Sequence, residues 1–176
     1  MKEVLLVDGY NMIGAWPDLS QLKESNQMEE ARDRLLQRLS NYSAYQGLTT
    51  WVIFDAMFVP GLSKSYQKYR LKVVFTAEGQ TADSYIEAMI DKHTDLLTQV
   101  TVATSDLAEQ RLVFQKGAVR KSAMELLGDV EKTEKLIRYG EKTFDRGTQV
   151  SYQRHNPWNY HQIQALRCLL HDLEKH

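Results

Sequence analysis

The stretch EVLLVDGYN at residues 3–11 decides the fold, because it joins a buried strand to a polar segment. Residues 3–7 form a short and almost continuous apolar run, which is typical of a strand buried on both faces of a parallel sheet. The run ends at Asp8, and residues 8–11 predict a turn. The first strand therefore delivers an aspartate to its carboxyl end.

Later segments repeat the alternation of short apolar strands with amphipathic helices. Strands are predicted over residues 50–54, 72–75 and 100–103. Helices are predicted over residues 29–45, from 81 to about 90, 104–115, 121 to about 139 (in one piece or two pieces broken near Gly128), and from 157 or 158 to the end. Gly47 predicts the end of the first of these helices, and Thr81 predicts a cap for the second. We therefore expect a three-layer α/β domain, with a central, mostly parallel sheet and helices on both faces.

The length and composition predict one globular domain. The chain has 176 residues, of which 43% are hydrophobic and 26% charged, as in folded domains. Without a repeat or a low-complexity segment to mark a boundary, we expect a single domain over residues 1–176, with a core of about 1–130 and a helical extension of about 131–176. No segment approaches the ~20 apolar residues that cross a bilayer, so no membrane contact is expected.

The cysteine content and the net charge restrict the classes of function. Cys168 is the single cysteine, which excludes an internal disulfide and a cysteine-based zinc cluster and agrees with a cytoplasmic location. The formal net charge is −1, so the chain is not a polycation. Any contact with nucleic acid therefore has to rest on local basic patches.

Carboxylates stand at the ends of the predicted strands. Asp8, Asp55 and Asp106 follow three of them, and Asp83 lies in the first turn of a predicted helix. Because the carboxyl ends of parallel strands meet at one edge of the sheet, we expect these side chains to gather where ligands bind in open α/β sheets. Any one of them alone also fits a turn or a helix cap.

Such a cluster predicts a divalent metal site. Neighbouring carboxylates repel one another unless a basic side chain or a cation compensates them, and the immediate flanks of the four aspartates hold no lysine or arginine. Oxygen ligands suit Mg²⁺ or Mn²⁺. Asn11 is a candidate supporting residue. Asp55 also fits a purely structural role, and Glu87, one turn after Asp83, fits a metal ligand or an exposed surface position equally.

Several motifs occur in an order that resembles the YacP-like branch of the NYN domains, which are relatives of PIN-domain nucleases. The motifs are VDGYN at 7–11, FDA at 54–56, TADSYIE at 81–87, TSD at 104–106, Gln110, GA at 117–118 and RKSAME at 120–125. The resemblance covers about residues 1–130. It implies a PIN/NYN-like fold and a metal-dependent endoribonuclease, in which Asp8, Asp83 and Asp106 fall on the acidic, metal-holding positions and Asn11 on the supporting amide. More narrowly, it implies cleavage of mRNA at the translating ribosome, with no preference for DNA.

Basic and aromatic side chains alternate between the second and third predicted strands, a pattern found in proteins that bind single-stranded RNA. The candidate RNA-binding residues there are Lys64, Lys68, Tyr69, Arg70 and Lys72, and a second basic site holds Arg120 and Lys121. A solvated basic loop with tyrosines packed beneath it fits the first pattern equally. Trp16, near the acidic edge, is a candidate contact for a substrate, although a buried indole is its default interpretation.

Two other functions compete with the nuclease as interpretations of the sequence. A signalling receiver domain would use Asp55 as its phosphorylated residue, but it needs an acidic pair after the first strand, where Gly9 follows Asp8, and a lysine near Asp106. A non-catalytic module that binds RNA or the ribosome would be marked by loss of an acidic position. All of these positions are occupied, which favours an enzyme.

Overall fold

The computed structural model of the chain describes residues 2–55, 69–93, 97–106, 113 and 115–145. The chain divides into two compact units, Met1–Leu136 and Ile137–His176. The fold and the site described below belong to the first unit. The helix predicted from residue 157 or 158 onward, Gln110 and most of the helix predicted over 104–115 lie outside the described residues.

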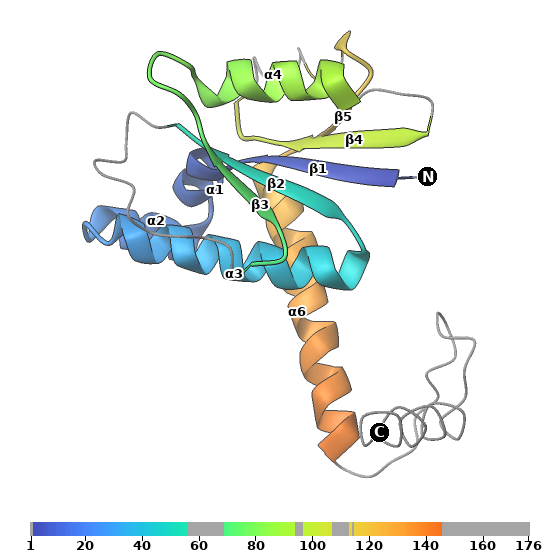
Figure 1. Cartoon of the computed structure of the whole chain (residues 1–176). Coiled ribbons are helices and arrows are strands. Elements are labelled where there is room, and N and C mark those ends of the chain that lie inside the picture. The colour runs from blue at the N-terminus through green and yellow to red at the C-terminus, as the bar shows by residue number, and fades with distance from the viewer. Residues whose placement is uncertain (1, 56–68, 94–96, 107–112, 114, 146–176) are drawn as a thin grey trace, which may run out of the picture. The chain divides into compact units, whose positions relative to one another are not determined.

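A five-stranded parallel sheet forms the centre of the first unit (Figure 1). Its spatial order is β3-β2-β1-β4-β5. The strands are β1 (Lys2–Asp8), β2 (Thr49–Phe54), β3 (Lys72–Phe75), β4 (Thr98–Ala103) and β5 (Val119–Lys121). The central strand β1 is buried from Val4 to Asp8, as the apolar run predicts. The predicted parallel α/β architecture is confirmed.

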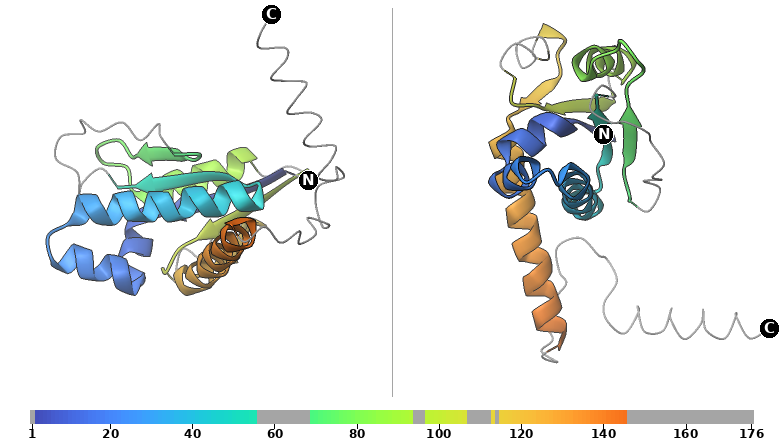
Figure 2. Two further views of the ribbon diagram at one scale, coloured as in Figure 1. Left: turned by 90° about the horizontal axis from the view of Figure 1, so that it is seen from below. Right: turned by 90° about the vertical axis from the view of Figure 1, so that its left-hand side faces the viewer.

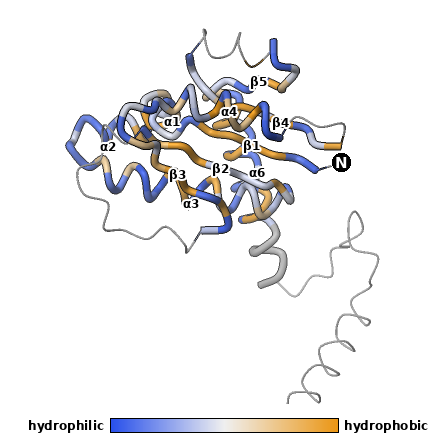
Figure 3. Tube along the Cα trace, turned by 45° about the horizontal axis from the view of Figure 1, so that its top comes forward, coloured by the Kyte–Doolittle hydropathy of each residue, from blue (hydrophilic) through white to orange (hydrophobic). Residues whose placement is uncertain are grey.

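Helices cover both faces of the sheet (Figure 2). They are α1 (Gly9–Ala15), α2 (Pro17–Glu24), α3 (Met28–Gln46), α4 (Ala82–His93) and α6 (Ala123–Asp145). One core cluster joins the sheet to α1, α2, α3 and the start of α6, and the other joins the opposite face to α4. The hydrophobic colour in Figure 3 accordingly runs along the central strands. No helix of the described part combines the length and the apolar character needed to cross a membrane.

Several helix boundaries follow from local signals in the sequence. Gly47 ends α3 in the left-handed conformation with φ of 72°, as predicted. The Thr81 hydroxyl accepts a hydrogen bond from the backbone N–H of Ser84 at 3.2 Å, which confirms the predicted cap of α4. The Ser122 hydroxyl and the Glu125 carboxylate each accept the other residue's backbone N–H, and this capping box starts α6 at residue 123.

Several local details differ from the prediction. Residues 9–11, predicted as a turn, form the first turn of α1, because Asp8 caps that helix directly at the end of β1. Helices α1 and α2 and the short strand β5 were not predicted at all. Helix α6 starts two residues later than predicted, and of the two alternatives left open, one piece or a break near Gly128, the helix is in one piece.

Phe54, at the end of β2, explains why a glycine follows Asp8. A Cβ atom on Gly9 would lie 2.2 Å from Cε1 of Phe54, far inside van der Waals contact. The Phe54 ring is fully buried, packs edge-on against Tyr10 with centroids 5.1 Å apart and stacks on Phe75 at 5.4 Å. A side chain at position 9 would therefore have to displace a ring that is packed against two other rings.

The first prediction compares two helical glycines of α1. Gly9→Ala is expected to lower the free energy of unfolding by about 1–3 kcal/mol, the usual cost of overpacking a core. Gly14→Ala is the matched control, because its Cβ would meet nothing within 4 Å and alanine favours a helix by roughly 0.5–1 kcal/mol. Urea unfolding followed by circular dichroism measures both. Equal stabilities of the two variants would contradict the packing argument.

Candidate active site

The candidate site lies at the switch point of the sheet. Chain connections run from β1 outward through β2 to β3, and then return to β4 on the other side of β1. Open α/β sheets bind ligands beyond the carboxyl ends of the strands at such a point. Here Asp8 ends β1 and Ser105 follows β4, and the parallel register pairs Val7 with Ala103.

Asp8 is held by a short hydrogen-bond network. Its side chain is 5% exposed, and its carboxylate accepts the backbone N–H of Asn11 at 3.1 Å. The second carboxylate oxygen accepts the Asn11 side-chain amide, and the Ser105 hydroxyl donates to the carbonyl oxygen of that amide. Asn11 therefore links the ends of β1 and β4, and its supporting role in the site stays a prediction. Ser105 was not singled out from the sequence.

The aspartates interact through their charges. Burial raises the pKa of the Asp8 carboxyl above its usual value; the hydrogen bonds from Asn11 oppose the rise, and the charge of Asp83 adds to it. The pKa of Asp83 is also raised, first by partial removal from water and then by the charges of Asp106 and Asp55. The four predicted aspartates therefore act on one another electrostatically, although they lie far apart in the sequence.

A cleft of about 420 Å³ lies beside this network. Asp8, Asp55, Asp83, Asn11 and Ser105 contribute to its lining. Helices α1 and α2 contribute Tyr10, Gly14, Ala15 and Lys23. Sequence reasoning missed this second set, because α1 and α2 were not predicted. A proline after Trp16, at a favoured helix start, was the available signal for α2.

The chemistry of the donor set fits a hard divalent cation. Among the described residues, neither Asp8 nor Asp83 makes an ion pair with a basic side chain, so a cation would compensate charges that the protein leaves uncompensated. In the same part of the chain, no three His, Cys, Asp or Glu side chains stand close enough together to chelate one ion. Mg²⁺ is usually held by one or two carboxylates while it keeps several waters, so the arrangement does not require such a group.

Glu87 belongs to a different cluster. Its carboxylate lies 3.2 Å from the ammonium of Lys116, which also pairs with Asp91 at 2.7 Å. Glu87 does not appear in the lining of the cleft. These contacts favour the alternative of an exposed surface position, and the role of Glu87 as a metal ligand stays a prediction.

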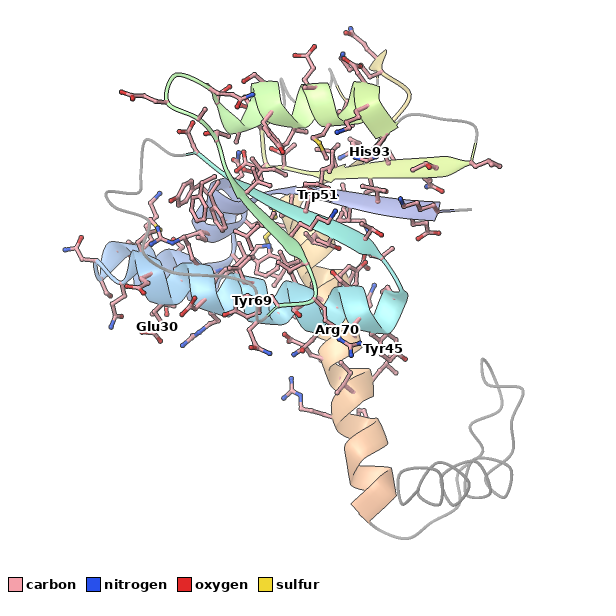
Figure 4. The ribbon with its side chains drawn as sticks, in the orientation of Figure 1. Glu30, Tyr45, Trp51, Tyr69, Arg70 and His93 are labelled. Atoms are coloured by element: carbon pink, nitrogen blue, oxygen red, sulfur yellow. The ribbon has the colours of Figure 1, made fainter. Side chains whose placement is uncertain are left out.

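The predicted RNA-binding residues separate into buried and exposed positions. Figure 4 labels two of them, Tyr69 and Arg70. Tyr69 is 8% exposed, and its hydroxyl donates to the backbone carbonyl of Asp33 at 3.4 Å, so it packs in the core and its prediction as an RNA contact is corrected. Arg70 and Lys72 are exposed, and the Lys72 ammonium lies 4.2 Å from the ring centroid of Trp51. Lys64 and Lys68 lie outside the described residues.

The structure also shows the contacts of the second basic site and of Trp16. Arg120 and Lys121 lie on β5, where Arg120 is 3.6 Å from Glu125 and Lys121 pairs with Asp129 at 2.8 Å. Trp16 is fully buried, and its indole N–H donates to the backbone carbonyl of Ala123 at 2.9 Å. The default interpretation of Trp16, a packed indole, is therefore correct.

The fold and the site define a nuclease-like α/β domain. The family model of the YacP-like NYN domain matches residues 5–170, and the chain belongs to this family. It is 50% identical over 135 residues to the uncharacterized protein YacP of Bacillus subtilis (strain 168), covering 77% of this chain and 79% of that protein. Membership indicates a nuclease-like function and sets aside the receiver-domain alternative.

Solved structures agree with the family assignment. The crystal structure of Rae1 (YacP) from Bacillus subtilis has a TM-score of 0.72 and 42% identity, covering 98% of this chain and 92% of that one. A structure of a mutant of the same protein has the same TM-score and identity, with coverage of 84% and 86%. Both similarities extend over most of each chain.

The second prediction tests the repulsion at the site. Because folding raises the pKa of Asp83, ionisation of this carboxyl costs stability as the pH rises from the unfolded pKa of about 3.9 through the folded value. Asp83→Asn removes that cost. The melting temperature of the metal-free protein should rise by about 1–3 °C at neutral pH. The gain should vanish at a pH below both pKa values, where the parent carboxyl is protonated in both states.

Asp91→Asn is the matched control for this measurement. Asp91 lies on the same helix as Asp83 but pairs with Lys116, so its neutralisation removes an attraction and should not raise the melting temperature. Thermal unfolding of parent and variants over a pH series in a chelator gives the comparison. A stabilisation by Asp83→Asn that is independent of pH would contradict the electrostatic argument.

Proposed function

We propose that this chain is a metal-dependent endoribonuclease that cleaves mRNA in association with the translating ribosome. The observation that carries the nuclease proposal is the set of mutually repelling aspartates around a cleft at the switch point of the sheet. Membership of the YacP-like NYN family supports it. The proposal of mRNA and the ribosome rests on the resemblance of the ordered motifs to that branch.

Each side chain has a defined part in the proposal. Asp8, Asp83 and Asp106 would hold Mg²⁺ or Mn²⁺, one or two of them directly and the rest through waters that the ion keeps, and Asp55 would add negative charge in the cleft. When bound, such an ion supplies Lewis acidity and promotes ionisation of water beside a phosphodiester. Asn11 orients the Asp8 carboxylate through two hydrogen bonds, and Ser105 fixes the amide of Asn11.

The third prediction concerns cleavage. Asp83→Asn should reduce the cutting of mRNA more than about 100-fold, beyond the ~10–100-fold that loss of a supporting partner of a metal ligand costs. Asp91→Asn should cut normally, because Asp91 lies near the other end of α4. The measurement maps new RNA ends bearing a 5′-phosphate in a purified bacterial translation reaction, with a parallel reaction on the same RNA without ribosomes.

The outcomes separate the parts of the proposal. Ends made by the parent and by Asp91→Asn, but not by Asp83→Asn, support the nuclease, and their dependence on ribosomes supports the site of action. Identical patterns with all three proteins would contradict catalysis at this cleft. The site would then be interpreted as part of a non-catalytic module that binds RNA or the ribosome.

The fourth prediction concerns the metal. A ligand that binds only the folded state stabilises it by RT ln(1 + [L]/Kd), which is about 1.4 kcal/mol when the ligand concentration is ten times Kd. Mn²⁺ or Mg²⁺ should therefore raise the melting temperature of the parent protein, because the ion relieves the repulsion between Asp8 and Asp83. Asp83→Asn should lose most of this increase while Asp91→Asn keeps it. Equal increases in all three proteins would place metal binding elsewhere.

A further inference from the structure

Lys23 lines the acidic cleft without pairing to any of its carboxylates. Among the described residues that line the cleft, it is the one basic side chain. It is exposed, and no carboxylate oxygen of the described part lies within ion-pairing distance of its ammonium. Because Lys23 has no ion-pair partner in the described part of the chain, its ammonium is available to an anion that enters the cleft.

The helix that carries Lys23 is firmly anchored. Leu19, one turn before it on α2, is fully buried, and Leu22 packs partly against the core. The corner between α1 and α2 is fixed by Trp16, whose indole bonds to the carbonyl of Ala123. The backbone of Lys23 is therefore held on a rigid element, although its side chain is free to adapt to a ligand.

The part of the cleft that α1 lines is open at Gly14. Gly14 and Ala15 line the cleft, and a Cβ atom added to Gly14 would meet nothing within 4 Å. A residue without a side chain lets another backbone approach the helix closely. Tyr10 is also in the lining, and its hydroxyl accepts a hydrogen bond from Arg32 at 3.2 Å, which fixes the ring.

We propose that Lys23 binds a phosphate of an RNA single strand beside the scissile position, and that Gly14 leaves room for the sugar–phosphate backbone. This inference rests on the proposed function, because it assigns the substrate contacts of the same cleft. A phosphodiester is negatively charged, so it can pair with the Lys23 ammonium. The carboxylates of the cleft repel the same phosphodiester, and a cationic side chain would offset this repulsion. The alternative role of Lys23 is a favourable interaction with the C-terminal dipole of α2, in whose last turn it lies.

The test measures binding apart from cleavage. In an Asp83→Asn background of the full chain, a fluorescein-labelled single-stranded RNA is titrated by anisotropy at salt concentrations from about 50 to 200 mM. Lys23→Gln should weaken binding several-fold at the lowest salt, equally for different sequences. It should also reduce the slope of log K against log salt by about 0.7, the value for one lost phosphate contact on a single strand.

Three further variants complete the experiment. Lys23→Arg should retain both the affinity and the slope. Lys2→Gln makes the same change of charge at the start of β1, the opposite end of the strand from Asp8, and should alter neither. Gly14→Leu should abolish binding, while urea unfolding shows that the protein is still folded, since the new side chain enters open space.

Each result decides for or against the inference. If Lys23→Gln behaves like Lys2→Gln, or if the background protein binds no RNA at about 50 mM salt, the inference is overturned. In cleavage by otherwise unaltered protein, Lys23→Gln should raise KM several-fold with kcat little changed, whereas a purely structural role would lower stability instead. If Lys23→Gln weakens RNA binding but the parent protein cleaves no RNA, the nuclease proposal is contradicted and the phosphate contact of Lys23 is still supported.

Discussion

The parallel pairing of β1 with β4 is the constraint on which the rest of the site depends. It sets Val7 beside Ala103, so that the residues after both strands leave the sheet at the same edge. The Asn11 amide then bridges Asp8 and Ser105, which are 97 residues apart in sequence by their numbers. A shift of this register by one residue would turn Asp8 to the other face and break the bridge. Negative charge gathers at this edge as a consequence of the topology.

Stability and function make opposing demands at the end of β1. Asp8 caps α1, which favours an ionised carboxylate, but it is buried beside Asp83, which favours the protonated form. Two hydrogen bonds from Asn11 offset part of the cost of keeping the charge. Gly9 is required for a separate reason, since Phe54 occupies the space of a side chain there. At the end of β1, Asp8 thus caps the helix, Asn11 offsets the cost of its charge, and Gly9 makes room for Phe54.

Much of this arrangement follows from local sequence signals, and the remainder depends on tertiary structure. The buried strands can be predicted from short runs of apolar and β-branched residues. A parallel topology then brings together the four aspartates Asp8, Asp55, Asp83 and Asp106. Helix α1 is only seven residues long and begins with glycine, so its propensity is weak and the capping by Asp8 and burial of Met12 and Ile13 decide it. Strand β5 has three largely exposed residues, which leave no alternating pattern. The burial of Tyr69 likewise depends on packing partners that lie far away in the chain.

The net charge of the chain indicates that it does not attract RNA from solution over long distances, so that a partner would have to present the substrate. With a formal net charge of −1 and a cleft lined by three carboxylates against one lysine, the protein gains no general electrostatic steering toward a polyanion. Arg120 and Lys121 are each close to a carboxylate, which reduces their contribution. A single contact such as that proposed for Lys23 positions RNA but adds little affinity at physiological salt. Under the proposed function, a larger partner that holds the strand at the cleft would replace this missing attraction, and the ribosome would be such a partner.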